Sequence, residues 1–210
     1  MSHKPLDIPA LLKEEFGTVA LVWKSNCSTR ALDALILSWV KYEKQLRRLF
    51  FHIACSTSLP KLMDSELEAA IIANKSLYSH NFIAGIEDLS NRKMADIVGD
   101  SFTKLDQEMC RIQEFRHKLI HGQLTGKKLN ARQLERKIGF VINWIEALAE
   151  GARSKFEFDG IVRGKQRRKR LKTTTSDAQI RFSDIEGFVD WLCKLSKKKP
   201  KKKQKCFDTQ

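Results

Sequence analysis

The chain lacks the marks of secreted and membrane proteins. It has five cysteines, an odd number, and no two of them form a Cys-x-x-Cys pair. Residues 1–10 contain no apolar run of the kind that a signal peptide needs, and no apolar stretch approaches the roughly 20 residues that span a bilayer. We therefore expect reduced thiols, a cytoplasmic location and no membrane partner.

The signatures of nucleotide-dependent enzymes and of common hydrolases are also missing. The sequence contains no P-loop, no glycine-rich dinucleotide fingerprint and no serine or cysteine hydrolase elbow. It contains no internal repeat. We expect no cofactor and no resident metal ion.

The composition suits a folded body with a basic extension. Of the 210 residues, 42% are hydrophobic and 30% charged, which favours one globular domain plus an appendage. The net charge of +14 is uneven: residues 161–210 hold 16 Lys and Arg against 5 Asp and Glu, whereas residues 1–160 hold 23 against 20. We expect a near-neutral body and a basic C-terminal arm that attracts polyanions, first nucleic acid and second an anionic membrane surface or an acidic partner.

The spacing of apolar residues predicts an all-α fold with four principal helices, at about 28–55, 65–91 (with breaks), 102–121 and 131–156. Short connections between most of them favour an antiparallel bundle. We divide the chain into a lead-in at 1–27, a helical bundle at 28–158 and the basic arm at 159–210. In the lead-in, Pro5 and Pro9 disfavour an early helix, and residues 18–23 are expected to be a short strand or an extended segment.

Local signals indicate where the helices begin and end. Ser65 with Glu68, and Asn130 with Gln133, match the capping-box pattern at a helix start. Gly122 is well placed to terminate the third helix.

The arm is expected to contain a short helix between two basic segments. Ser183 with Glu186 predicts the start of an amphipathic helix that runs through Leu195, and the lysine-rich residues 197–205 are expected to be disordered. The other basic segment is a candidate for RNA binding through Lys165, Arg167, Arg168, Lys169 and Arg170. Two alternatives remain for the basic runs, a solubilising tail and, at 163–172, a nuclear targeting signal.

The segment with chemical information is 115–122, which reads Phe-Arg-His-Lys-Leu-Ile-His-Gly. Arg116, the polar follower His117 and then His121 stand at the expected C-terminal end of the third helix. In this pattern the chain resembles the HEPN superfamily, whose nucleases carry Arg, a polar residue and then His after four to six intervening residues. The follower is His here, where Asn or Asp is commoner in the family. The resemblance covers about residues 28–156 and implies a HEPN-type four-helix bundle.

The resemblance implies a metal-independent endoribonuclease that acts as a homodimer. Arg116 and His121 are five residues apart, or about 140° around an ideal helix, so two copies facing across a two-fold axis would share one composite cleft. Histidine can take the proton of the RNA 2′-OH and protonate the leaving 5′-oxygen, and arginine can stabilise the phosphorane. The expected products are a 2′,3′-cyclic phosphate and a 5′-OH, and DNA should be inert. The family also implies a toxin or phage-defence effector, with an antitoxin protein as a further partner.

Other interpretations of the motif stay open. Arg116 and His121 also suit a surface position and a helix end, including in HEPN-like modules that bind RNA or a protein without cutting. His117 and His121 share one helix face, with Glu114 and Cys110 one and two turns earlier, so a metal site is a second alternative, although this spacing is not a standard closed zinc site.

Glu43 interrupts the apolar stripe of the first helix, four residues after Trp39. Either it lies at the solvated margin of that stripe, or it is buried and needs a partner because an unpaired buried charge is costly. We predict a supporting role in which Glu43 accepts a hydrogen bond from Arg116, His117 or His121.

Overall fold

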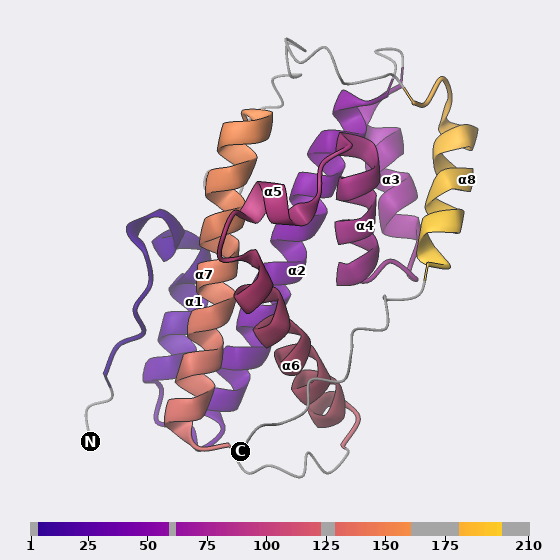
Figure 1. Cartoon of the computed structure of the whole chain (residues 1–210). Coiled ribbons are helices and arrows are strands. Elements are labelled where there is room, and N and C mark those ends of the chain that lie inside the picture. The colour runs from indigo at the N-terminus through magenta and orange to yellow at the C-terminus, as the bar shows by residue number, and fades with distance from the viewer. Residues whose placement is uncertain (1–3, 59–61, 123–128, 161–180, 199–210) are drawn as a thin grey trace.

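The computed structural model describes residues 4–58, 62–122, 129–160 and 181–198. The residues described form helices and one isolated β-bridge, between Ser58 and Phe182, so the fold is all-α, as the sequence predicts (Figure 1). In chain order the elements are η1 (Ala10–Leu12), α1 (Lys13–Lys24), α2 (Arg30–Ser56), α3 (Asp64–Ala73), α4 (Ser79–Ser90), α5 (Met94–Val98), α6 (Phe102–Ile120), α7 (Ala131–Phe156) and α8 (Ile185–Ser196).

The long helix α2 is the centre of the molecule. It packs against α1, α4 and α7, and α7 in turn supports α5 and α6 (Figure 1). Its apolar residues recur at helical spacing, and Leu46, Leu49 and Phe50 have no exposed surface. The helix predicted at 28–55 is thus confirmed, and its faces organise the rest of the core.

The lead-in was predicted wrongly: residues 13–24 form the helix α1 rather than a strand or an extended segment. Pro9 caps the short helix η1 and precedes α1, so neither proline interrupts it. Phe16, Val19 and Trp23 are buried at helical spacing against α2. Local β-branched residues suggested a strand, but burial of this helical stripe decided the conformation.

The predicted segment 65–91 is two helices, α3 and α4. The cap of α3 is two residues earlier than the sequence suggests, because the Glu66 carboxylate accepts a hydrogen bond from the backbone N–H of Met63 at 3.0 Å. Tyr78 begins α4 in a similar way, since its backbone N–H donates to Asn81 Oδ1 at 2.9 Å. Neither helix begins at the predicted Ser65–Glu68 pair.

The third and fourth predicted helices are confirmed as α6 and α7. Asn130 and Gln133 form the predicted capping box, in which each side chain accepts from the other residue's backbone N–H at 2.9 Å. Gly122 terminates α6 with a φ of 61°, a left-handed conformation that glycine adopts without strain. The chemical motif therefore stands where the sequence places it, at the C-terminal end of α6.

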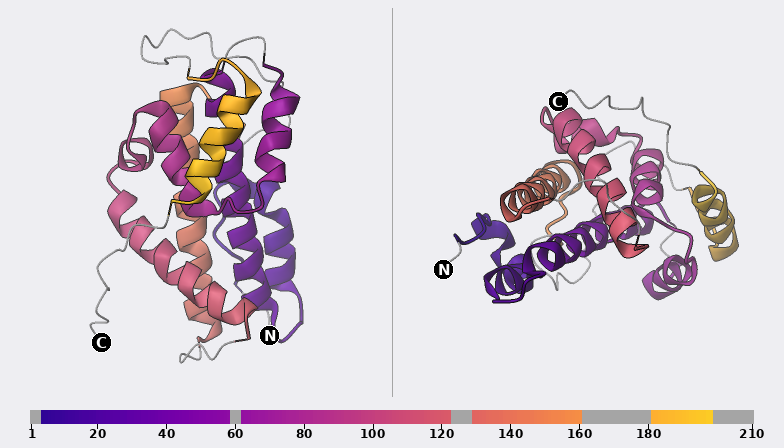
Figure 2. Two further views of the ribbon diagram at one scale, coloured as in Figure 1. Left: turned by 90° about the vertical axis from the view of Figure 1, so that its right-hand side faces the viewer. Right: turned by 90° about the horizontal axis from the view of Figure 1, so that it is seen from below.

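The helix predicted in the basic arm exists as α8, and it packs on α3 and α4. Its cap is Asp184 rather than Ser183, since Asp184 Oδ1 accepts from the backbone N–H of Gly187 at 2.8 Å. Seen from below, α8 lies at the edge of the molecule opposite α1 (Figure 2). Its buried residues belong to the same core as the rest of the bundle: Phe188, Leu192 and Leu195.

Polar contacts also hold α8 and the residues before it in place. Trp191 Nε1 donates to Asp88 Oδ2 at 2.9 Å, and Arg181 contacts Asp88 Oδ1 at 3.3 Å. The backbone N–H of Arg181 also donates to the carbonyl of Thr57, at the end of α2, at 2.8 Å. Residues 181–198 are therefore part of the packed body. The predicted RNA-binding residues and most of the lysine-rich end lie outside the described residues: Lys165, Arg167, Arg168, Lys169, Arg170 and 199–205.

Candidate active site

The motif residues occupy one arc at the end of α6. At 100° per residue, Ile120, His117 and His121 follow Arg116 around the helix at about 40°, 100° and 140°. Arg116 is half-buried at one edge of this arc, and both histidines are exposed at the other. Ile120, between them, leaves 52% of its surface exposed. The end of α6 therefore presents one cation and two imidazoles around an exposed apolar side chain.

Arg116 is held against the face of an aromatic ring. Its guanidinium carbon lies 5.8 Å from the centre of the Trp39 ring, within the range of a cation–π contact. Its Nε is buried and has no acceptor, and Arg116 makes no hydrogen bond or ion pair with another described residue. A buried unpaired N–H costs about 1–3 kcal/mol. A cation–π contact of about 0.5–2 kcal/mol offsets part of that cost and, unlike an ion pair with a carboxylate, does not neutralise the charge of the guanidinium.

Trp39 is the first of three buried aromatic rings that pack in a row, the first pair tilted and the second pair edge-on. Its ring centre lies 4.9 Å from that of Tyr42, which lies 4.9 Å from that of Trp144 on α7. The three residues are 1%, 3% and 1% exposed. Burial, together with the nearby Glu43 and Cys110, raises the pKa of the Tyr42 hydroxyl, which therefore stays neutral. This row of rings joins α2 to α7, and Arg116 packs on its first member.

Glu43 and Arg116 both contact Trp39. Glu43 Oε1 accepts a hydrogen bond from Trp39 Nε1 at 2.8 Å, one helical turn away. The predicted donors were Arg116, His117 and His121, and the hydrogen bond in the structure comes from the indole instead. The sequence placed Trp39 in the apolar stripe and did not reveal its contact with the motif. The i, i+4 spacing of Trp39 and Glu43 is the signal that was present.

His117 and His121 lie side by side at the helix end. Their ring centres are 4.4 Å apart, with the planes tilted by 59°. This separation follows from their i, i+4 spacing. It places the two imidazoles, which can both accept and donate protons, close enough to contact a single nucleotide. Among the described residues, no three His, Cys, Asp or Glu side chains lie close enough together to hold a metal ion. Cys110, Glu114, His117 and His121 therefore do not form such a group.

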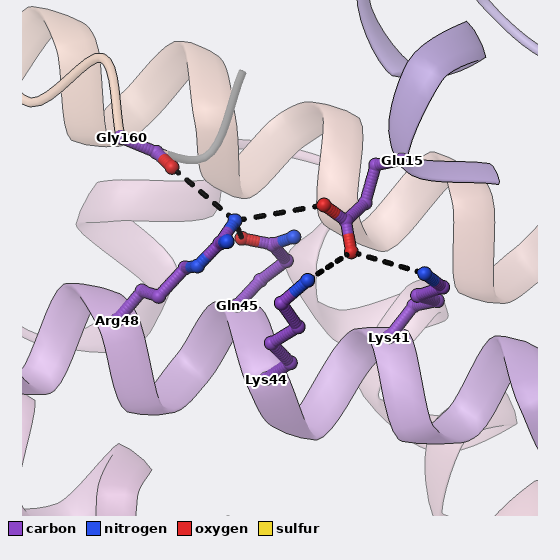
Figure 3. Close-up of polar contacts among 6 residues, drawn as sticks. All are labelled: Glu15, Lys41, Lys44, Gln45, Arg48 and Gly160. Atoms are coloured by element: carbon purple, nitrogen blue, oxygen red, sulfur yellow. Dashed lines mark hydrogen bonds and ion pairs between the residues drawn. The ribbon is translucent and has the colours of Figure 1, made fainter. Parts of the chain in front are cut away.

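A second charged cluster ties α1 to α2 (Figure 3). Glu15 on α1 contacts Lys44 at 2.9 Å, Lys41 at 3.4 Å and Arg48 at 3.5 Å. Arg48 also contacts the carbonyl of Gly160 at 3.5 Å. At 100° per residue these cations project from the side of α2 opposite Trp39, at about 140° to 200° from it. The cluster therefore does not belong to the Arg116 site.

The comparisons with known proteins give no relative. No family model, no curated protein and no solved structure matches the chain. Within the residues that are described, none of the helices has the length and apolarity to cross a bilayer.

Proposed function

We propose that this protein is a metal-independent endoribonuclease of HEPN type that works as a homodimer through Arg116 and His121. The observation that carries the proposal is the state of Arg116: a half-buried guanidinium with no carboxylate partner among the described residues, beside two exposed histidines at the end of one helix. Such a group is suited to a phosphate that arrives with the substrate.

In the proposed reaction a histidine accepts the proton of a 2′-OH, and the 2′-oxygen attacks the adjacent phosphorus. The P–O5′ bond breaks, and a second histidine donates a proton to the leaving 5′-oxygen. His121 and His117 supply these two groups within one chain, and a second copy across a two-fold axis supplies another pair. Arg116 stabilises the negative charge of the pentacovalent phosphorane. The products are a 2′,3′-cyclic phosphate and a 5′-OH.

The dimer has its own support in the exposure of Ile120. This side chain stands between Arg116 and the histidines on the arc and leaves about half of its surface to solvent. A second copy that covers Ile120 brings its own motif close to the first. Within this proposal the bundle is the HEPN-type four-helix arrangement, and the basic segment from 163 to 172 supplies affinity for RNA.

The test is cleavage of a generic single-stranded RNA in EDTA by the purified full chain. We expect cyclic-phosphate ends, no cleavage of the matching DNA, and loss of activity in Arg116→Ala and His121→Ala at unchanged helical content. The matched controls are Arg111→Ala, which removes an exposed arginine of the same helix, and His80→Ala on α4. Binding of RNA without cleavage would replace the enzyme by a non-catalytic RNA-binding module, and activity within a few fold of wild type in both motif variants would remove the catalytic assignment.

A further inference from the structure

We propose that Trp39 and Glu43 are positioning residues for Arg116: the indole ring is the platform that holds the guanidinium, and Glu43 fixes the orientation of that ring. This inference rests on the proposed function, since it assigns the devices that present Arg116 to a phosphodiester. It adds two residues of α2 to a motif confined to α6.

An aromatic platform does what a carboxylate partner cannot. A carboxylate would orient Arg116 but would neutralise it and compete with the phosphate for the same N–H donors. A ring face orients the guanidinium through its flat side without neutralising its charge and without occupying the N–H donors of its two terminal nitrogens. The structure has this arrangement, with the guanidinium carbon 5.8 Å from the Trp39 ring centre and the buried Nε without an acceptor.

The platform cannot move easily. Trp39 is 1% exposed and packs on Tyr42, which packs edge-on against Trp144 of α7. The position of the Arg116 guanidinium therefore depends on the packing of both α2 and α7. A rigid support matters because catalytic groups act only when they are held close to the productive geometry.

Glu43 acts on Arg116 through the indole. Its carboxylate accepts the Nε1 hydrogen of Trp39 at 2.8 Å and so fixes the rotation of the ring. A negative charge at that hydrogen also raises the electron density of the ring face, which strengthens its attraction for a cation. Glu43 thereby positions Arg116 indirectly, through Trp39, and does not neutralise the positive charge of the guanidinium.

The first arm of the test measures position without activity. In the full-length protein we expect the side-chain NMR signals of Arg116, assigned by their absence in Arg116→Ala, to be shifted upfield by the Trp39 ring. The shift should vanish in Trp39→Leu, persist in Glu43→Gln, which retains an acceptor oxygen, and decrease in Glu43→Leu. Signals of Arg116 that are the same in wild type and Trp39→Leu would overturn the platform.

The second arm measures cleavage of single-stranded RNA. We expect kcat to fall about tenfold or more in Trp39→Leu and Glu43→Leu with little change in KM, since small misplacements of a catalytic group cost up to about a hundredfold. Trp39→Phe, which keeps a ring face, and Glu43→Gln should recover most of the rate. Because Trp39 is buried, Glu43→Leu at a half-exposed position serves as the variant that keeps the fold if Trp39→Leu does not.

A double-mutant cycle separates positioning from a structural role. In an Arg116→Lys background, which keeps a cation at this position and is expected to keep a measurable rate, Glu43→Leu should lower the rate much less than it does in the wild type. An equal loss in both backgrounds, or wild-type kcat in Glu43→Leu and Trp39→Leu, would overturn the positioning role. A wild-type protein that shows the ring shift but cuts no RNA would overturn the proposed function and leave the platform geometry standing, so the two failures are distinguishable.

Discussion

Gly151 of α7 lies directly against the backbone of Ile97 in α5. A Cβ at Gly151 would stand 1.7 Å from the Ile97 carbonyl oxygen, far inside any real contact, and a backbone carbonyl cannot rotate away from it. The missing side chain lets α5 pack on α7. Since α5 leads into α6, this contact helps to set the position of the helix that carries Arg116.

We predict that Gly151→Ala lowers the free energy of unfolding by about 3 kcal/mol or more, because overpacking a rigid contact forces the two helices apart. Urea unfolding of both proteins measures the difference. Gly139 is the matched control on the same helix, since a Cβ there meets nothing within 4 Å. Gly139→Ala should raise stability by up to about 1 kcal/mol through helix propensity. Equal effects of the two substitutions would contradict the close approach of α5.

The Glu15 cluster predicts a dependence of stability on pH. Burial alone would raise the pKa of Glu15, but the hydrogen bond from Lys44 and the charges of Lys44, Lys41 and Arg48 outweigh it and lower the pKa. A carboxyl whose pKa is lower in the folded state stabilises the fold above its ordinary value of about 4.5. That stabilisation is lost as the pH falls through the lower, folded value.

We therefore expect Glu15→Gln to reduce the free energy of unfolding at neutral pH and to have little effect once the pH is below the folded pKa of Glu15. Denaturant titrations at a series of pH values measure this difference. Glu14→Gln, which removes an exposed carboxylate from the preceding position of α1, is the control. A Glu15→Gln effect that is the same at neutral and strongly acidic pH would show that the cluster stabilises the fold by packing and not by charge.

The spacing of apolar residues was sufficient to predict α2, α6 and α7. The capping box of Asn130 and Gln133 at the start of α7 was also predicted correctly. The helix α1 was missed because Thr18, Val19 and Val22 favour a strand locally, while the surface that buries Val19 belongs to α2. Tertiary context decided the outcome at this position.

The packing of Arg116 on Trp39 and the docking of α8 could not be predicted, for the same physical reason. Arg116 and Trp39 are far apart in sequence, and the pattern of one helix says only that an apolar face needs a cover. It does not say that α3 and α4 cover α8, or that an arginine from α6 covers the face of the Trp39 ring. The motif positions were predictable because they depend on spacing within one helix.

The proposed dimer predicts a specific effect at Ile120. This residue is four positions after Arg116, on the same face of α6, and 52% of its surface is exposed. Ile120→Glu would place a charge in an interface that covers this face. We expect a change from dimer to monomer at micromolar concentration by light scattering, with loss of RNA cleavage, while the helical content stays unchanged.

The control for that experiment is Leu21→Glu, since Leu21 is an apolar residue of α1 that is 71% exposed. It should affect neither mass nor activity. A wild-type protein that is already monomeric, or an Ile120→Glu variant that remains dimeric and active, would contradict an interface at the end of α6.

The last prediction concerns the basic segment between α7 and α8. Removing everything after residue 160 cannot test it, because the same cut removes Phe188, Leu192 and Leu195, which are at most 1% exposed in the core. The informative variant keeps α8 and changes five side chains to glutamine: Lys165, Arg167, Arg168, Lys169 and Arg170. Its folding should match that of the wild type.

We expect this variant to bind RNA more weakly and with a flatter salt dependence. The slope of log K against log salt should change by about 0.7 for each phosphate of a single strand that the variant leaves unneutralised. Because the proposal assigns these five side chains to RNA binding and none of them to proton transfer or charge stabilisation, KM should rise while kcat changes little. The control removes the same charge from five exposed lysines of the body: Lys13, Lys24, Lys75, Lys93 and Lys104. If affinity and salt dependence fall equally in the two variants, net charge alone attracts the RNA and the basic segment is no separate binding element.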